Sequence, residues 1–320
     1  MPLSGPDGAV GRAIGNAARL AMLDTGTKAF ELTVIDTAQG GASAAARQAI
    51  ASNHGLILGP LLGQDVRAVT PLAQRARVPV IAFSNDREAA GPGTYILGFT
   101  PSQAIERVVS EAARRGDRRL AAVVPASDYG QRSAQALAAA VRQSGGQVVG
   151  IETYPAGGSP RAAVQRLSTR PFDALLIADG ARAAVLAAPA IPRDARVLGT
   201  ELWAGGGVGT SARLRGAWFA APTQGRWSQF VQRYKARYSG QNPPRIASLG
   251  YDAVLLATRA ARSWAPGRRF PLGAIDDREG FAGVDGIFRF PPGNVAQRAF
   301  EVRAVTATGS TLVSPAPTSF

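Results

Sequence analysis

Short apolar stretches alternate with amphipathic stretches along most of the chain. The apolar stretches lack the alternation of a half-exposed strand, which is typical of parallel strands that are covered on both faces. The stretches between them carry apolar residues at helical spacing. This succession predicts an α/β protein with doubly wound parallel sheets. The predicted strands cover residues 31–36, 55–58, 78–83, 95–99, 119–124, 147–153, 172–178, 195–198 and 217–220.

The last third of the chain shows a different pattern. Two long helices are predicted over residues 227–238 and 246–263, separated by Asn242-Pro243-Pro244. Residues 286–290 and 299–303 then alternate apolar and polar positions, as the strands of an antiparallel hairpin do. The length of 320 residues suits two domains of similar size, each able to bury a core.

The first residues predict the end of a strand, a loop and a helix. Pro2-Leu3 fits the strand end, Ser4 to Gly8 the loop, and an apolar-periodic helix follows. The free N–H groups at such a helix start can bind an anion or a dipole, and the alternative is that glycine and proline here only form the turn. A strand of two residues is short for a buried sheet. We therefore expect the numbering to begin inside a natural element, with the rest of it and any signal peptide upstream.

The net charge of +14 comes almost entirely from arginine, because lysine occurs only at positions 28 and 235. Nucleic-acid binding is disfavoured, since the arginines are spread over many helices and do not interleave with aromatic residues as a stacking platform requires. The densest group is Arg114, Arg115, Arg118 and Arg119. A loose affinity for an anionic surface, such as a membrane face, fits this distribution better. No apolar run approaches the ~20 residues that span a bilayer.

The residue inventory argues against catalysis. The chain has no cysteine and a single histidine, His54, which we expect in a turn, so zinc chemistry and a histidine cluster are excluded. No nucleophile elbow, phosphate-binding lysine loop or dinucleotide fingerprint is present. We expect no enzyme, no metal and no cofactor.

Ligands of open α/β sheets bind at the carboxyl ends of the strands. The residues at the predicted strand ends are small, polar, acidic or aromatic, which suits a pocket for a small polar ligand. Each has a structural alternative: Asp65 can cap its helix, Ser84 and Asn85 can close a turn, and Glu201 can be a surface carboxylate. The candidate ligand-binding residues are Ser4, Gln64, Asp65, Ser84, Asn85, Asp86, Tyr129, Asp179, Glu201 and Trp203. For Tyr129 the alternative is packing on the pocket wall, and for Trp203 it is an anchor between lobes.

Several of these motifs resemble those of type I periplasmic binding proteins, which include the leucine/isoleucine/valine-binding proteins of ABC importers. The resemblance covers nearly the whole chain and rests on the order and spacing of its motifs. They are Pro2 to Pro6 with Gly8 and Gly11, Leu58-Gly59-Pro60, Val78 to Ile81, Asp128-Tyr129-Gly130 and Tyr251-Asp252-Ala253. A closer resemblance, to the penicillin-binding-protein activators, rests on Ala82 to Asp86, Gly98 to Pro101, Gly199-Thr200 with Trp203, and the basic surface. Those activators are outer-membrane lipoproteins that stimulate peptidoglycan synthases.

The resemblance implies two lobes joined by a hinge that the chain crosses three times, near Thr100, Pro222 and Val284. The first lobe would be residues 1–100 plus 222–283, and the second 101–221 plus 284–320. In amino-acid binders of the family, hydroxyl and backbone N–H groups of the first lobe hold the ligand carboxylate. The Tyr of the D-Y-G motif, here Tyr129, and an acidic residue, here Glu201, help to hold the remainder of the ligand.

The chain departs from the family pattern in the first lobe. Gln64-Asp65 and Asn85-Asp86 stand where serine and threonine are usual. Acidic residues there would repel a ligand carboxylate. This argues against an ordinary α-amino acid and favours a different polar ligand, cationic or neutral, or no ligand at all. Two interpretations therefore stay open. One is a periplasmic receptor that closes on a small polar ligand and delivers it to an ABC permease. The other is a lipid-anchored regulator that contacts a peptidoglycan synthase.

Overall fold

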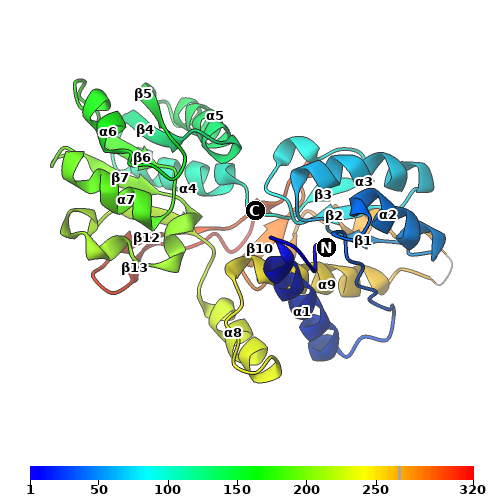
Figure 1. Cartoon of the computed structure of the whole chain (residues 1–320). Coiled ribbons are helices and arrows are strands. Elements are labelled where there is room, and N and C mark those ends of the chain that lie inside the picture. Colours follow the sequence, from blue (N-terminus) through cyan, green and yellow to red (C-terminus); the bar gives the residue numbers. More distant parts are fainter. Residues whose placement is uncertain (266–267) are drawn as a thin grey trace. The chain divides into compact units, whose positions relative to one another are not determined.

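The computed structural model describes residues 1–265 and 268–320, which divide into two compact units (Figure 1). Unit 1 consists of Met1–Thr100, Thr223–Ala299 and Thr318–Phe320, and unit 2 of Pro101–Pro222 and Phe300–Pro317. The chain passes from unit 1 to unit 2 after Thr100 and returns after Pro222, and it passes between the units a third time. The third was predicted near Val284. It follows Ala299 instead, because residues 284–299 form sheet strands with a neighbour in unit 1.

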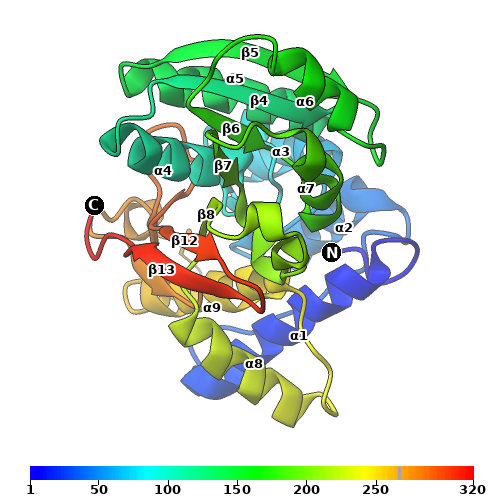
Figure 2. The ribbon, with the colours of Figure 1, turned by 90° about the vertical axis from the view of Figure 1, so that its left-hand side faces the viewer.

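Unit 2 is built on a seven-stranded mixed sheet in the order β13-β12-β8-β7-β6-β4-β5. The five strands from β4 to β8 are parallel, and β12 runs antiparallel to both of its neighbours. Figure 2 shows the β12–β13 hairpin beside β8. The strands are β4 (Arg119–Pro125), β5 (Gln147–Tyr154), β6 (Ala174–Ile177), β7 (Arg196–Gly199), β8 (Trp218–Ala221), β12 (Glu301–Val305) and β13 (Ser310–Ser314).

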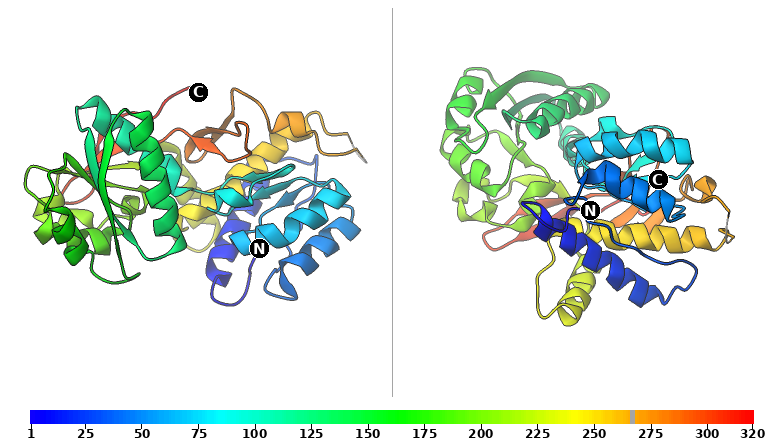
Figure 3. Two further views of the ribbon diagram at one scale, coloured as in Figure 1. Left: turned by 90° about the horizontal axis from the view of Figure 1, so that it is seen from above. Right: turned by 45° about the vertical axis from the view of Figure 1, so that its right-hand side comes forward.

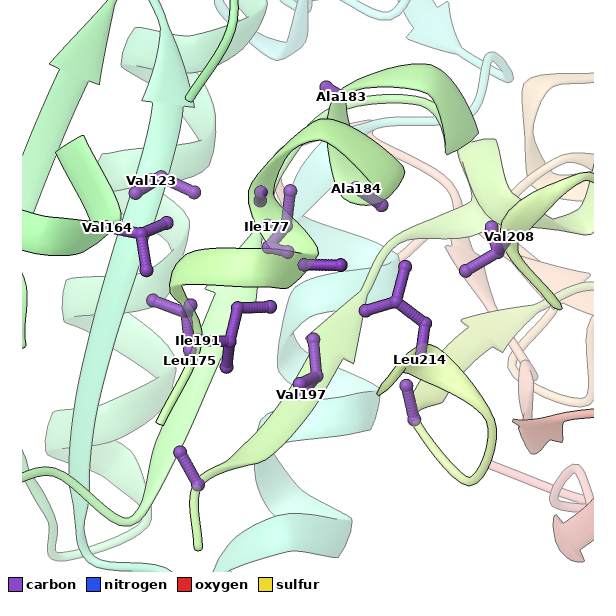
Figure 4. Packing of buried hydrophobic residues seen from close by; sticks show 14 of the residues in the cluster. Val123, Val164, Leu175, Ile177, Ala183, Ala184, Ile191, Val197, Val208 and Leu214 are labelled. Atoms are coloured by element: carbon purple, nitrogen blue, oxygen red, sulfur yellow. The ribbon is translucent and has the colours of Figure 1, made fainter. Parts of the chain in front are cut away.

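Helices cover both faces of this sheet. On one face α6 and α7 close a core in which Val123, Leu175, Ile177 and Val197 are buried (Figure 4). Helices α4 and α5 pack against each other and against the strands. This covering explains why the strands are apolar throughout. The helices are α4 (Pro101–Arg114), α5 (Asp128–Gln143), α6 (Arg161–Leu167) and α7 (Ala181–Ala187), followed by the 3-10 turns η2 (Ala188–Ala190), η3 (Glu201–Gly205), η4 (Val208–Thr210) and η5 (Ala212–Leu214).

Unit 1 contains two small sheets. The parallel sheet has the order β1-β2-β3 and the antiparallel sheet the order β11-β10-β9. Helix α1 lies beside α9 (Figure 3), and α2 packs on α3. The strands are β1 (Ile57–Leu58), β2 (Val80–Ala82), β3 (Thr94–Ile96), β9 (Phe281–Gly283), β10 (Gly286–Arg289) and β11 (Gln297–Arg298). The helices are α1 (Gly8–Thr25), α2 (Gly41–Ala51), α3 (Gly63–Ala76), α8 (Gly225–Arg237) and α9 (Ser248–Ala261), with the 3-10 turns η1 (Arg87–Ala89), η6 (Arg245–Ala247) and η7 (Leu272–Ala274).

Three sequence predictions for strands were wrong. Residues 31–36 belong to no sheet strand in the described part of the chain, although the Met1 backbone bonds to Ile35 and Thr37 at their end. The strand around residues 55–58 is half-buried rather than buried. Residues 286–290 and 299–303 are not partners in one hairpin, because β10 pairs with β9 and β11 whereas β12 pairs with β8 and β13. The alternation of polarity was read correctly, but it does not specify which strand is the partner.

Arg298 ties the antiparallel sheet of unit 1 to its parallel sheet and to α9. Its side chain is fully buried and donates through Nη2 to the Leu97 carbonyl at 2.8 Å. Its Nη1 lies 3.8 Å from Asp252 Oδ2, and its guanidinium lies 4.7 Å from the ring centre of Phe99. Burial and the nearby charge of Asp285 raise the pKa of Asp252, so the cation of Arg298 is needed to balance this site.

We predict that Arg298→Met lowers the free energy of unfolding by about 3–5 kcal/mol, because it leaves the buried carboxyl group of Asp252 without its neighbouring cation, whereas Asp285 keeps its ion pair with Arg245. Adding Asp252→Asn should restore part of this loss. The control is Arg233→Met, which breaks an exposed ion pair with Asp24 and should cost about 1 kcal/mol or less. Urea denaturation measures all three, and equal effects of Arg298→Met and Arg233→Met would contradict the role assigned to Arg298.

Candidate functional site

In unit 2 the candidate residues stand at the carboxyl ends of adjacent parallel strands. Tyr129 lies in the first turn of α5, directly after β4, and Ser127 caps this helix by accepting a hydrogen bond from the Gly130 N–H at 3.2 Å. Glu201 begins η3 directly after β7. Asp179 follows β6, the strand between them. The residues that the strand-end argument selected in unit 2 therefore lie along one edge of this sheet.

Tyr129 and Glu201 are in direct contact. The Tyr129 hydroxyl donates to Glu201 Oε1 at 3.2 Å and lies 3.1 Å from Thr200 Oγ1. Because the tyrosine proton goes to the glutamate, the threonine hydroxyl is the donor to Tyr129. Sequence analysis had named Thr200 in the Gly199-Thr200 motif but not as a ligand-binding candidate, although it adjoins Glu201 in the same strand end.

The second carboxylate oxygen of Glu201, Oε2, is buried and has no hydrogen-bond partner in residues 1–265 and 268–320. Burial raises the pKa of Glu201 to about 7, and burial together with the Glu201 charge raises the pKa of Tyr129. A buried, unpaired carboxylate oxygen carries a large desolvation penalty. The site therefore favours a partner that donates hydrogen bonds and carries positive charge.

Trp203 is buried rather than exposed as a stacking wall, and the Asp179 carboxylate has partners within unit 2. The Asp179 carboxylate accepts from the Tyr154 hydroxyl at 2.6 Å and from the Gly180 N–H at 2.6 Å. Trp203 is 2% exposed, lies against Phe219, and donates its indole N–H to the Asp179 carbonyl at 2.8 Å. Trp203 is thus a core residue of unit 2 that supports the site from behind, not a stacking wall.

Tyr154 is a further strand-end residue, in contact with the candidate Asp179, that sequence analysis did not name. It ends β5, so the same strand-end argument would have found it had it been applied to that strand. The ring is buried, and its hydroxyl holds Asp179 in place. Burial and Asp179 raise the pKa of Tyr154, so it remains a neutral donor.

In unit 1 Ser84, Asn85 and Asp86 follow β2, as predicted. Asp86 is 2% exposed, pairs with Arg67 Nη1 at 2.5 Å, and caps η1 through the Glu88 N–H. Ser84 is buried and accepts from the Asp86 N–H at 3.0 Å. Ser84 and Asp86 therefore shape a turn, and Asp86 carries a charge that is balanced by Arg67.

The other candidates of unit 1 lie outside this turn. Gln64 and Asp65 are at the start of α3, and Ser4 is in the opening loop. Gln64 is exposed and Asp65 half-buried in the first turn of α3, where burial raises the pKa of Asp65. The Ser4 hydroxyl donates to Asp36 Oδ2 at 3.0 Å. Asp36 also accepts from the Leu3 N–H at 2.8 Å, which lowers the pKa of Asp36. Ser4 thus anchors the opening loop to residue 36.

Within residues 1–265 and 268–320, no cluster of histidine and acidic side chains has the grouping of a metal site. Over the same residues, none of the helices is both long and apolar enough to cross a membrane.

The comparisons with known proteins agree with this architecture. The sequence model of the family described as periplasmic binding protein matches residues 1–283. No curated protein matches the chain. Among solved structures, a protein of Rhodospirillum rubrum provisionally described as a branched-chain amino acid ABC transporter has a TM-score of 0.85 at 21% identity, covering 98% of this chain and 97% of its own.

Two further structures were solved with ligands. A solute-binding protein of Rhodopseudomonas palustris in complex with 3,4-dihydroxybenzoic acid has a TM-score of 0.71 at 20% identity, covering 99% of this chain and 95% of its own. A branched-chain amino acid substrate-binding protein of Streptococcus pneumoniae in complex with isoleucine has a TM-score of 0.68 at 19% identity. The match covers 98% of this chain and 97% of the Streptococcus protein. At these identities the likeness concerns the fold.

We predict that Glu201 makes the stability of unit 2 depend on pH. Its carboxyl stays protonated up to about pH 7 in the native state, whereas in the unfolded chain it ionises near 4.5. Its contribution is therefore complete below pH 4.5 and is lost as pH rises through about 7, by roughly 3 kcal/mol in all. Glu201→Gln should flatten this slope in urea unfolding. Glu152→Gln, which breaks the Arg166 ion pair, is the control and should retain it. A slope unchanged by Glu201→Gln would refute the assignment.

Proposed function

Since this chain belongs to the periplasmic binding protein family, and is therefore a solute-binding protein rather than an enzyme, we propose that it captures an amino-acid-like ligand in the periplasm for an ABC importer. Ligand capture would proceed by hinge closure of the two units, the motion for which periplasmic binding proteins are the standard example. The ligand would be small and polar, with a positively charged amino group.

The observation that carries this proposal is the unpartnered Oε2 of Glu201 beside the Tyr129 hydroxyl. An ammonium group offers three N–H donors and a positive charge. It would supply the hydrogen bond that Oε2 lacks and would stabilise the ionised carboxylate. The Tyr129 hydroxyl already holds Oε1, so the carboxylate is oriented before the ligand arrives.

The same observation distinguishes between the two ligand classes of the structural relatives. Isoleucine has an ammonium group, whereas 3,4-dihydroxybenzoic acid has only hydroxyl and carboxyl groups. A benzoate would leave Glu201 without a cation, and the carboxyl would have to remain protonated. Glu201 therefore favours an amino-acid-like ligand for this chain.

The structure also changes the argument about acidic residues in unit 1. Asp86 would repel a ligand carboxylate if its charge were unbalanced. Its pairing with Arg67 at 2.5 Å offsets that charge. Of the two acidic departures from the family pattern, only Asp65 still argues against a ligand carboxylate nearby, and burial raises its pKa toward the neutral form.

The second candidate function is a lipid-anchored regulator of a peptidoglycan synthase. It is favoured by the sequence resemblance of residues 82–86 and 98–101 and by the net charge of +14. It predicts retention of a synthase in a pull-down and a faster glycan or crosslinking reaction, with no dependence on Glu201. A ligand-binding receptor predicts no retention of a synthase, no faster synthase reaction, and ligand binding that depends on Glu201.

We predict that one amino acid in a thermal-shift panel of amino acids, polyamines, small amides, benzoates and muropeptide fragments raises the Tm clearly. A ligand at 100 times its Kd adds about 2.7 kcal/mol to native stability. In calorimetric titration of that amino acid, Glu201→Gln should weaken binding at least about tenfold, and Tyr129→Phe by a smaller factor.

The matched controls are Glu152→Gln and Tyr238→Phe, which alter a surface ion pair and a hydroxyl bonded to the Asn16 carbonyl. Both should bind with unchanged affinity. No thermal shift across the panel, or unchanged affinity in both site variants, would count against the receptor and favour the synthase regulator.

A further inference from the structure

Four charged side chains from four separate elements meet inside unit 1. Arg245 comes from η6, Asp252 from α9, Asp285 from the turn between β9 and β10, and Arg298 from β11. The side chains of Asp252, Asp285 and Arg298 are 0% exposed, and that of Arg245 is 24% exposed. We call these four residues the charge cluster. None of them is among the candidate ligand residues.

The charge cluster contains two anions and two cations. Arg245 Nη2 lies 2.5 Å from Asp285 Oδ1, and Arg298 Nη1 lies 3.8 Å from Asp252 Oδ2. The Val284 N–H donates to the other oxygen of Asp252, Oδ1, at 2.7 Å. The cluster therefore joins η6, α9, β11 and the β9–β10 turn through charged groups and the backbone.

Arg298 connects the cluster to the first and third passages of the chain between the units. Its Nη2 donates to the Leu97 carbonyl at 2.8 Å, and its guanidinium lies 4.7 Å from the ring centre of Phe99. These residues come just before Thr100, after which the chain enters unit 2. Arg298 is itself followed by Ala299, the last residue of unit 1 before the third passage. One buried side chain is thus fixed at the unit 1 ends of two passages.

Arg245 connects the cluster to the second passage. Its Nη2, which pairs with Asp285, also donates to the Thr223 carbonyl at 2.9 Å. Thr223 is the first residue of unit 1 after that passage. The guanidinium lies 4.5 Å from the ring centre of Trp227, which helps to fix its plane. The unit 1 ends of all three passages therefore bond to, or belong to, the same cluster.

Stability alone does not account for charges at this place. The desolvation of a buried ion pair offsets most of its attraction, so well-packed apolar residues would stabilise the unit as well. The cost is visible at Asp252, whose pKa is raised by burial and by the charge of Asp285. In the described part of the chain, Asp252 Oδ2 and the Nε and Nη1 of Arg298 have no hydrogen-bond partner. What a guanidinium adds is direction, because it binds one particular carbonyl, whereas apolar side chains allow sliding.

We propose that the charge cluster anchors the hinge, by holding the unit 1 ends of the three passages in one rigid body so that closure bends only the residues at the passages. A hinge consists of a few residues that absorb the change in backbone angles, and bending stays confined to them only where the flanking segments are fixed. The four residues act as positioning residues. This proposal rests on the closure motion of the proposed function, but not on the ligand or on Glu201.

The test measures distances within the ligand-free protein. The chain has no cysteine, so introduced pairs of cysteines carry spin labels at known places. The inter-unit pair is Ser52→Cys in unit 1 with Gln143→Cys in unit 2, and the intra-unit pair is Ser52→Cys with Gln241→Cys, both in unit 1. All three positions are exposed. Double electron–electron resonance gives the distribution of the distance between the labels in each pair.

The main variant is Arg245→Met, and Arg259→Met is its matched control. Arg259 also belongs to unit 1, pairs with an aspartate, Asp277, and donates to a backbone carbonyl, that of Gly280, at 2.7 Å. Its guanidinium also lies over an aromatic ring, 5.0 Å from the centre of Phe281. The two arginines therefore make the same kinds of contact, but those of Arg259 are not at a passage.

We predict that Arg245→Met makes the inter-unit distribution at least about 1.5-fold wider, because the second passage loses its anchor and bending spreads along the chain. Its intra-unit distribution should keep its width, and Arg259→Met should change neither. Equal inter-unit widths in the two variants would overturn the proposal. So would an intra-unit distribution that widens as much as the inter-unit one, since the cluster would then serve only the packing of unit 1.

A second variant tests the other two passages. Asp252→Asn keeps the shape of the side chain but leaves the buried Arg298 without its neighbouring anion, and Asp277→Asn is the matched control. Asp252→Asn should widen the inter-unit distribution, whereas Asp277→Asn should not. An unchanged width in Asp252→Asn would overturn the role of Arg298. Because no ligand is used, a thermal-shift panel without a hit would count against the receptor and leave these outcomes as they are.

Discussion

A parallel β-strand must be covered on both faces and hydrogen-bonded on both edges, and much of this protein follows from that constraint. In unit 2 the interior strands β4, β6, β7 and β8 meet it, with helices on either face and the β12–β13 hairpin beyond β8, whereas β5 is the half-exposed edge strand. Polar side chains are then restricted to the strand ends. There Tyr129, Thr200 and Glu201 come together, although they are far apart in the sequence. In unit 1 the strand β2 meets the same constraint, because it lies between β1 and β3.

The desolvation of Glu201 connects fold to function. The sheet and η3 bury one carboxylate oxygen without a partner, and Tyr129 holds the other. Burial alone raises the pKa toward neutrality, so the carboxyl is poised between its two forms at physiological pH. A cationic ligand would tip that balance to the ionised form. The buried Tyr154–Asp179 pair and Trp203 beside it keep the surrounding strand ends rigid.

Much of the fold could be predicted from the sequence because apolar strands and amphipathic helices are local patterns. The parallel strands of unit 2 and the residues at their carboxyl ends followed from them. The functions of Asp86 and Trp203 did not, because they depend on Arg67 and Phe219, which the fold brings in from other segments. The third passage between units was misplaced for the same reason, since alternation in residues 286–290 cannot name its partner strand. Tyr154 could have been predicted in the same way, because it is the last residue of β5.

The most direct test of the central claim is the number of protons released when the amino acid that stabilises the protein most binds at pH 7. Calorimetric titration in two buffers of different ionisation enthalpy gives this number. If an ammonium group ionises Glu201, whose pKa is about 7, roughly half a proton should leave per ligand bound, and Glu201→Gln should abolish the release. Binding without proton release, or with proton uptake, would contradict the assignment of Glu201 as the carboxylate that holds the ligand's amino group.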